Sequence, residues 1–218
     1  MDSAGDMLKP SEAAVVARVA LRDVNRAIDE HILPEGFFSL DEGRRVAATA
    51  CTLIAFYFDS AKRLTSEERL FAIREAGSRF YRFRGRALAS LTEEDWTVRD
   101  EFLTIDLAPF VRRTNERMER LAAAREMVVS DPNVLGGAPV VRGTRVPVHD
   151  VAASMAAGVP MGRILAAYPS LDAGKIELAT IYAEANPIRG RPRTGDEFPP
   201  KGAVVVAERR VLRRRKAG

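Results

Sequence analysis

The fold of the C-terminal part is decided by residues 131–187, DPNVLGGAPVVRGTRVPVHDVAASMAAGVPMGRILAAYPSLDAGKIELATIYAEANP. Gly136, Gly137 and Pro139 are typical of a turn, because glycine accepts a positive φ and proline presets the backbone angle that turns use. Residues 140–148 then predict two short extended pieces around the loop RGTR at 142–145. This stretch therefore begins with strands and a turn before its helices.

Proline and glycine divide the rest of this stretch into three helices. Asp150 opens the first helix and Gly158 closes it, since glycine is favoured just beyond a helix end. Pro160 suits the first turn of the second helix, which Pro169 ends. Ser170 is placed to cap a third helix that runs to about residue 186. The prediction is a compact three-helix module with short β-strands.

These residues resemble the family called domain of unknown function 433, a small helix-turn-helix-like module common in bacterial toxin–antitoxin operons. The resemblance rests on the run GGAPVVRGTRVPV at 136–148 and the turn YPSL at 168–171, in the family's order and spacing. A long form of that family, with an additional N-terminal DNA-binding domain, looks like a VapB-type antitoxin. The length and layout of this chain are similar to the long form, which implies a PIN-domain ribonuclease toxin as partner.

Residues 12–34, EAAVVARVALRDVNRAIDEHILP, predict a helix-turn-helix near the N-terminus. Pro10 and Ser11 open its first helix, a break falls at residues 18–20, and Val24 and Ile28 turn one side of the second helix inward. The segment resembles the opening of MerR-like DNA-binding domains, with Arg18 in place of the usual glycine of the turn.

The chain departs from the MerR-like pattern after this pair of helices. The wing is shortened to residues 35–38, and Ser39 and Glu42 form a capping box. That box predicts a long helix from residue 40 to about residue 60.

The exposed side of the second predicted helix carries the candidate DNA contacts Arg22, Asn25 and Arg26. Arginine can make two hydrogen bonds to a guanine edge and asparagine two to an adenine edge. Arg18, in the turn, is expected to meet phosphate instead. A solvated charged face is the alternative, because short patterns of this kind also arise by chance.

The positive charge is concentrated at the C-terminal end. Residues 187–218 contain ten Lys and Arg against three acids, whereas residues 1–186 contain 24 against 27. The prolines and glycines of the same segment predict a disordered basic tail that becomes ordered on an acidic partner. A tail that only confers solubility is the alternative. If the tail binds the acidic active site of a nuclease, the candidate toxin contacts are Arg189, Arg191, Arg193, Arg209, Arg210 and Arg213.

The three-helix module lacks the charge for DNA binding. Residues 150–186 contain two basic residues and four acids, a net charge of −2 that repels phosphate. We therefore expect a dimerisation or docking module. A homodimer would also match the two-fold symmetry of a palindromic operator.

Residues between the two modules predict a further helix, strands and a linker. Thr65 and Glu68 form a capping box, and the run FYRFRGR at 80–86 predicts an edge strand more readily than a surface for single-stranded nucleic acid. Residues 97–106 alternate similarly, and residues 107–127 predict a charged amphipathic helix. The expected domains are 1–90 for DNA binding, 91–126 for the strand and linker helix, 127–187 for the three-helix module, and 188–218 for the tail.

Nothing in the sequence predicts catalysis, a cofactor or a metal site. His31 and His149 stand alone near helix ends, and the single cysteine, Cys51, lies in an apolar helical run, which indicates a buried thiol in a reducing compartment. The apolar run at 46–58 spans 13 residues, short of the roughly 20 that a membrane helix needs. The N-terminal residues lack a signal-peptide pattern. We expect a cytoplasmic protein that is not an enzyme.

Two functions remain open at this point. The first is the antitoxin of a type II toxin–antitoxin system, which neutralises a PIN-domain ribonuclease and represses its own operon by binding double-stranded operator DNA. The alternative is a stand-alone MerR-like transcriptional regulator whose basic tail strengthens DNA binding.

Overall fold

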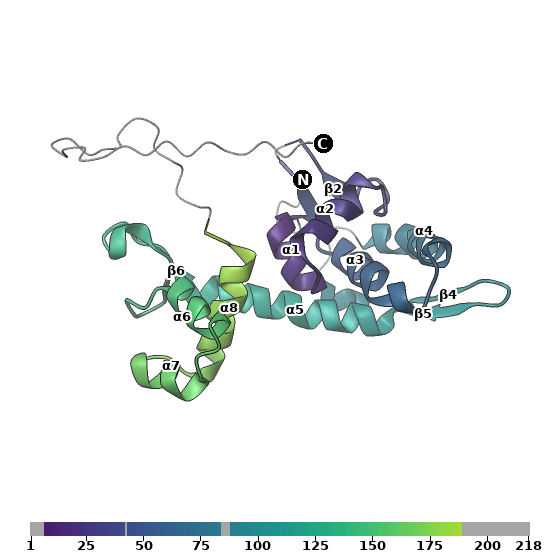
Figure 1. Cartoon of the computed structure of the whole chain (residues 1–218). Coiled ribbons are helices and arrows are strands. Elements are labelled where there is room, and N and C mark those ends of the chain that lie inside the picture. The colour runs from purple at the N-terminus through teal and green to yellow at the C-terminus, as the bar shows by residue number, and fades with distance from the viewer. Residues whose placement is uncertain (1–6, 42, 84–87, 189–218) are drawn as a thin grey trace, which may run out of the picture. The chain divides into compact units, whose positions relative to one another are not determined.

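The computed structural model describes residues 7–41, 43–83 and 88–188 (Figure 1). The chain divides into two compact units, Met1–Pro187 and Ile188–Gly218, and nearly all of the described residues belong to the first. Within these ranges the fold is mainly helical with small sheets, as predicted. The helices are α1 (Pro10–Ala17), α2 (Leu21–Asp29), α3 (Ala50–Asp59), α4 (Ser66–Arg82), α5 (Ala108–Met127), α6 (Val148–Ala156), α7 (Met161–Ala167) and α8 (Ala173–Ala185). The strands are β1 (Met7–Leu8), β2 (Phe38–Ser39), β3 (Arg45–Ala47), β4 (Thr97–Arg99), β5 (Thr104–Asp106), β6 (Val128–Val129) and β7 (Val140–Val141).

The larger apolar core joins a three-stranded antiparallel sheet to helices α1 to α5. β3 is the central strand, since Val46 pairs with Leu8 of β1 on one side and with Phe38 of β2 on the other. Helix α3 packs against α1, α4 and α5. Val16 of α1 and Val24 of α2 are fully buried in the same core. The N-terminal helices are thus held in place by burial of their apolar sides.

Helices α1 and α2 are joined by a sharp turn at residues 18–20. The predicted start at Pro10 is confirmed, and the Glu12 carboxylate accepts a hydrogen bond from the backbone N–H of Lys9 at 2.8 Å. Arg18 ends α1 with φ 57° and ψ 49°, the left-handed conformation. A residue with a Cβ pays roughly 1–2 kcal/mol there, which explains why glycine suits this turn. Asp23 then caps α2 by accepting from the backbone N–H of Ala20 at 3.2 Å.

The helix predicted over residues 40–60 is wrong in its first half. β2 and β3 pair as an antiparallel hairpin that extends beyond the wing expected at 35–38, and α3 begins only at Ala50. Gly43, in the loop between the strands, has a φ of +89°, which does not occur within a helix. Val46 is fully buried between two strands, so cross-strand pairing overrides the local helix signal. Glu42 of the predicted capping box lies outside the described residues.

The capping box at the start of α4 is confirmed. The Thr65 hydroxyl accepts from the backbone N–H of Glu68 at 3.3 Å, and the Glu68 carboxylate accepts from the backbone N–H of Thr65 at 2.6 Å. The strand predicted for residues 80–86 is wrong where the structure describes it, because residues 80–82 form the last turn of α4. The Phe80 ring is fully buried and stacks on Trp96 with centroids 3.9 Å apart. Residues 84–87 lie outside the described ranges.

The alternation at 97–106 forms a hairpin of β4 and β5, with Phe102 exposed at its tip. The helix predicted over 107–127 is confirmed as α5. The hydroxyls of Thr114 on α5 and Thr52 on α3 share a buried hydrogen bond of 2.8 Å. α5 also packs against α1 and α8, and Figure 1 shows it extending from the N-terminal helices to α8.

A smaller core holds together the C-terminal module. β6 pairs antiparallel with β7, and α6, α7 and α8 bury Val151, Ile164 and Ile176 between them. The three helices fall where they are predicted, but two of their first residues differ. α6 begins at Val148 rather than at Asp150, and Asp172 caps α8 in place of Ser170 by accepting from the backbone N–H of Lys175 at 2.8 Å.

Candidate nucleic-acid interface

Helix α2 has one buried and one exposed face. Val24, Ala27 and Ile28 lie in the core. Arg22 and Arg26 lie on the other face, as the spacing of the apolar residues predicts, and the Arg22 side chain is 89% exposed. The structure therefore places two arginines one turn apart on an open helix surface, at the spacing that puts side chains side by side.

Arg26 is oriented by a neighbour on the same helix. Its Nε lies 2.9 Å from the Glu30 carboxylate, one turn further along, and this hydrogen bond raises the pKa of Arg26. The contact engages only the Nε edge of the guanidinium. The two terminal Nη groups make no hydrogen bond within the described residues, so they can still donate as a pair to a base edge.

Arg44, in the loop between β2 and β3, ties this hairpin to the face of α2. Its Nη1 and Nη2 lie 3.1 and 2.7 Å from the two carboxylate oxygens of Asp29, a bidentate ion pair. The same Nη1 donates to Asn25 Oδ1 at 3.0 Å. Asn25 is half-buried, and its amide oxygen is already engaged by Arg44. Arg44 also neutralises the Asp29 carboxylate, which would otherwise repel phosphate on this surface.

Sequence reasoning missed Arg44, because it read residues 40–60 as one helix. The glycine directly before it was the available signal, since Gly43 between two polar residues is typical of a hairpin loop. A hairpin reading would have brought Arg44 next to α2.

Arg18 occupies a different surface from the other three candidate DNA contacts. From the turn after α1, it lines an open pocket together with Arg113 and Arg117 of α5. The structure thus brings Arg22, Asn25 and Arg26 together on α2 and places Arg18 beside α5 instead.

The arginine-bearing loop of the C-terminal module has an internal role for one of its two arginines. The guanidinium of Arg142 donates to the backbone carbonyl of Glu126, near the end of α5, through Nε at 2.9 Å and Nη2 at 2.7 Å. This contact satisfies a carbonyl at a helix end. Arg145 is exposed, and the six candidate toxin contacts between Arg189 and Arg213 lie outside the described residues.

Groups with chemical reactivity are sparse among the described residues. Burial raises the pKa of the Cys51 thiol to about 12, so it stays protonated and is a poor nucleophile. His149 lies beside Tyr182 with ring centroids 6.4 Å apart. Residues 7–41, 43–83 and 88–188 hold no group of three His, Cys, Asp or Glu placed to bind a metal ion. The same ranges contain no helix with both the length and the apolar character needed to cross a bilayer.

Comparisons with known proteins match the C-terminal module to one family and the whole chain to one relative. Residues 128–183 match the family described as "Protein of unknown function (DUF433)", which confirms that part of the sequence resemblance. The whole chain is 66% identical over 218 residues to "Uncharacterized protein y4eO" of Sinorhizobium fredii, covering all of this chain and 98% of that protein. The chain therefore belongs to the same family as y4eO. No solved structure matches it.

Proposed function

We propose that this protein is the antitoxin of a type II toxin–antitoxin system, which binds its own operator DNA through α1, α2 and the hairpin of β2 and β3. The observation that carries the DNA-binding part is the exposed face of α2. Arg22 and Arg26 project from a helix whose other face is fixed in the core, and rigid placement of this kind favours base readout.

The hairpin supports the same proposal. Arg44 offsets the negative charge of Asp29, so this carboxylate does not repel phosphate beside the two arginines of α2. The three-stranded antiparallel sheet beside α1 and α2 supports the proposal, because a winged DNA-binding domain also places a hairpin next to its recognition helix. The helix-turn-helix assignment is part of this proposal.

The C-terminal module has a different role in this proposal. Its negative charge disfavours contact with DNA, and we infer that it binds a second copy of the chain instead. Dimerisation would place two α2 helices on one DNA duplex, as half-sites of a palindrome require.

Neutralisation of a PIN-domain ribonuclease is the part of the proposal that rests on the sequence. Its support is the resemblance of the chain to long-form VapB-type antitoxins and the excess of arginine after residue 187. A guanidinium offers a charged fork to a cluster of carboxylates. A stand-alone MerR-like regulator is the alternative, and an adjacent gene for a small nuclease would favour the antitoxin.

The DNA-binding part is tested by a double substitution on α2. Arg22→Ala with Arg26→Ala should weaken binding to the protein's own promoter fragment by about 2–5 kcal/mol in band-shift titrations at fixed salt. Arg163→Ala, an exposed arginine on α7, is the matched control and should bind as the unsubstituted protein does. Unchanged affinity in the double variant would remove α2 from the interface.

A further inference from the structure

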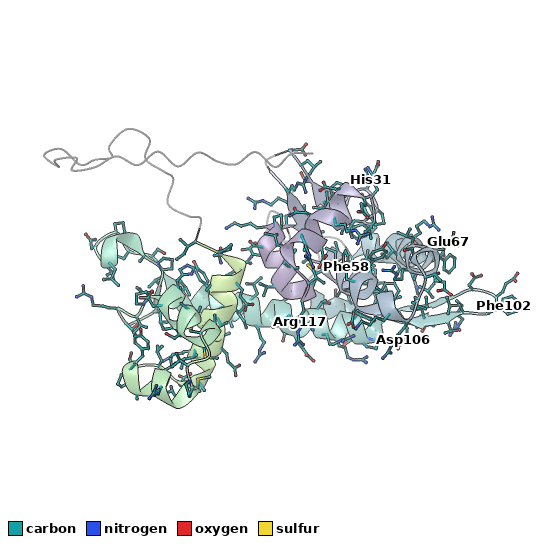
Figure 2. The ribbon with its side chains drawn as sticks, viewed as in Figure 1. His31, Phe58, Glu67, Phe102, Asp106 and Arg117 are labelled. Carbon is teal, nitrogen blue, oxygen red and sulfur yellow. The ribbon has the colours of Figure 1, made fainter. Side chains whose placement is uncertain are left out.

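A pocket of about 440 Å³ lies between the turn that joins α1 to α2 and one side of α5. Pockets that hold small molecules have volumes of roughly 300–1,000 Å³. Figure 2 labels two of the residues that line it, Phe58 and Arg117. Neither Arg22 nor Arg26, the arginines of α2 that carry the proposed DNA contact, lines this pocket.

Positive charge in the pocket exceeds negative charge. Arg18, Arg113 and Arg117 line it, against the carboxylates of Asp23 and Asp59. Arg113 Nη1 lies 3.6 Å from Asp59. Within the described ranges, neither Arg18 nor Arg117 has a carboxylate within the 4.0 Å of an ion pair, so neither guanidinium group has an ion-pair partner.

Arg117 shows the electrostatic consequence of this arrangement. It is half-buried, and its Nη1 donates to the backbone carbonyl of Val16 at 3.3 Å. Its pKa is lowered, first by burial and then by the positive charges of Arg18 and Arg113, which outweigh the opposing effect of Asp59 and Glu116. A bound anion would offset this repulsion.

The remaining wall of the pocket is apolar. Ala17, Ala55, Phe58 and Phe110 line it, and the guanidinium of Arg113 lies 4.6 Å from the centre of the Phe110 ring. Phosphate groups of a DNA backbone would leave this wall exposed to water. A ligand with both an anionic group and an apolar body would cover the whole lining.

We propose that this pocket binds a small organic anion, a carboxylate or phosphate attached to an apolar body. Arg18 and Arg117 hold the anionic group, and Phe58 and Phe110 hold the apolar body. The ligand contacts both α5 and the turn that precedes α2. Binding does not depend on the proposed function in DNA recognition.

The test is isothermal titration calorimetry of the full chain with phenyl phosphate, and with inorganic phosphate and phenol as its two halves. We expect phenyl phosphate to bind at least about tenfold more tightly than either half, because it reaches both walls. Arg117→Gln should weaken this binding by about tenfold or more. Arg112→Gln, an exposed neighbour on α5 outside the pocket, is the matched control and should bind as the unsubstituted protein does.

A second variant and a competitor keep the result unambiguous. Arg18→Asn removes the charge on the other side of the pocket, and asparagine tolerates the left-handed backbone of this turn. It should weaken binding as Arg117→Gln does while both variants keep the melting temperature of the unsubstituted protein within a few degrees. Equal loss in Arg112→Gln, or no binding of phenyl phosphate, would overturn the proposal. Displacement of phenyl phosphate by random-sequence duplex DNA would reassign the pocket to the DNA backbone.

Discussion

Arg44→Ala should weaken DNA binding although both terminal nitrogens of Arg44 are already engaged by groups on α2. The substitution removes both hydrogen bonds to Asp29 and the one to Asn25, and it leaves the Asp29 carboxylate without its counter-charge. The arginines that face DNA in the proposal, Arg22 and Arg26, are unchanged. The expected loss therefore measures the effect of the hairpin on the charge of the α2 surface.

The magnitude follows from the exposure of the ion pair. The side chains of Arg44 and Asp29 are 40% and 54% exposed, so water screens their attraction. Such a pair contributes about 0.2–1 kcal/mol to folding, and the melting temperature should fall by only a few degrees. A carboxylate about 4 Å from a DNA phosphate in water is repelled by about 1 kcal/mol, which corresponds to about a fivefold loss of affinity.

Band-shift titrations with the protein's own promoter fragment provide the assay. Arg44→Ala should bind about fivefold more weakly, and less so at high salt, because salt screens the repulsion. Adding Asp29→Asn to this variant removes the negative charge and should restore the affinity. The reasoning is refuted if Arg44→Ala binds as tightly as the unsubstituted protein, or if the double variant stays as weak as the single one.

Three further predictions concern other parts of the chain. Phe80→Ala should lower the free energy of unfolding by about 3–5 kcal/mol in urea titrations, because it empties the buried site against Trp96, whereas Phe102→Ala at an exposed hairpin tip should change it little. Cys51 should react with a thiol reagent only after unfolding, and rapid labelling of the folded protein would contradict this. The free energy of unfolding should also fall as pH rises from 9.0 toward 12, because only the unfolded chain then loses the thiol proton. On the proposed antitoxin function, a chain ending at Asn186 should fail to protect RNA from a cognate PIN-domain ribonuclease yet still bind the promoter fragment; full protection would place the partner surface on the C-terminal module.

Local signals in the sequence were sufficient for most of the helices. The start of α1 at Pro10, the capping box at Thr65 and Glu68, and the length of α5 follow from residues within a few positions of each other. Helix starts and ends depend on backbone groups that nearby side chains satisfy, so they can be read without the rest of the fold. The face of α2 that carries Arg22 and Arg26 was predictable for the same reason, since the spacing of Val24 and Ile28 fixes it.

Tertiary contacts decided the elements whose partners are distant in the sequence. Residues 45–47 form a strand because β3 pairs with β1, more than 30 residues earlier, and residues 80–82 stay helical because Phe80 stacks on Trp96. The ion pair of Arg44 with Asp29 likewise joins separate elements. So does the arginine group of the pocket, which consists of Arg18, Arg113 and Arg117. Pairing and burial of this kind depend on the position of the partner in space. The sequence therefore determined the helices and the exposed face of α2, and only the tertiary structure determined the hairpin beside that face and the pocket beneath its turn.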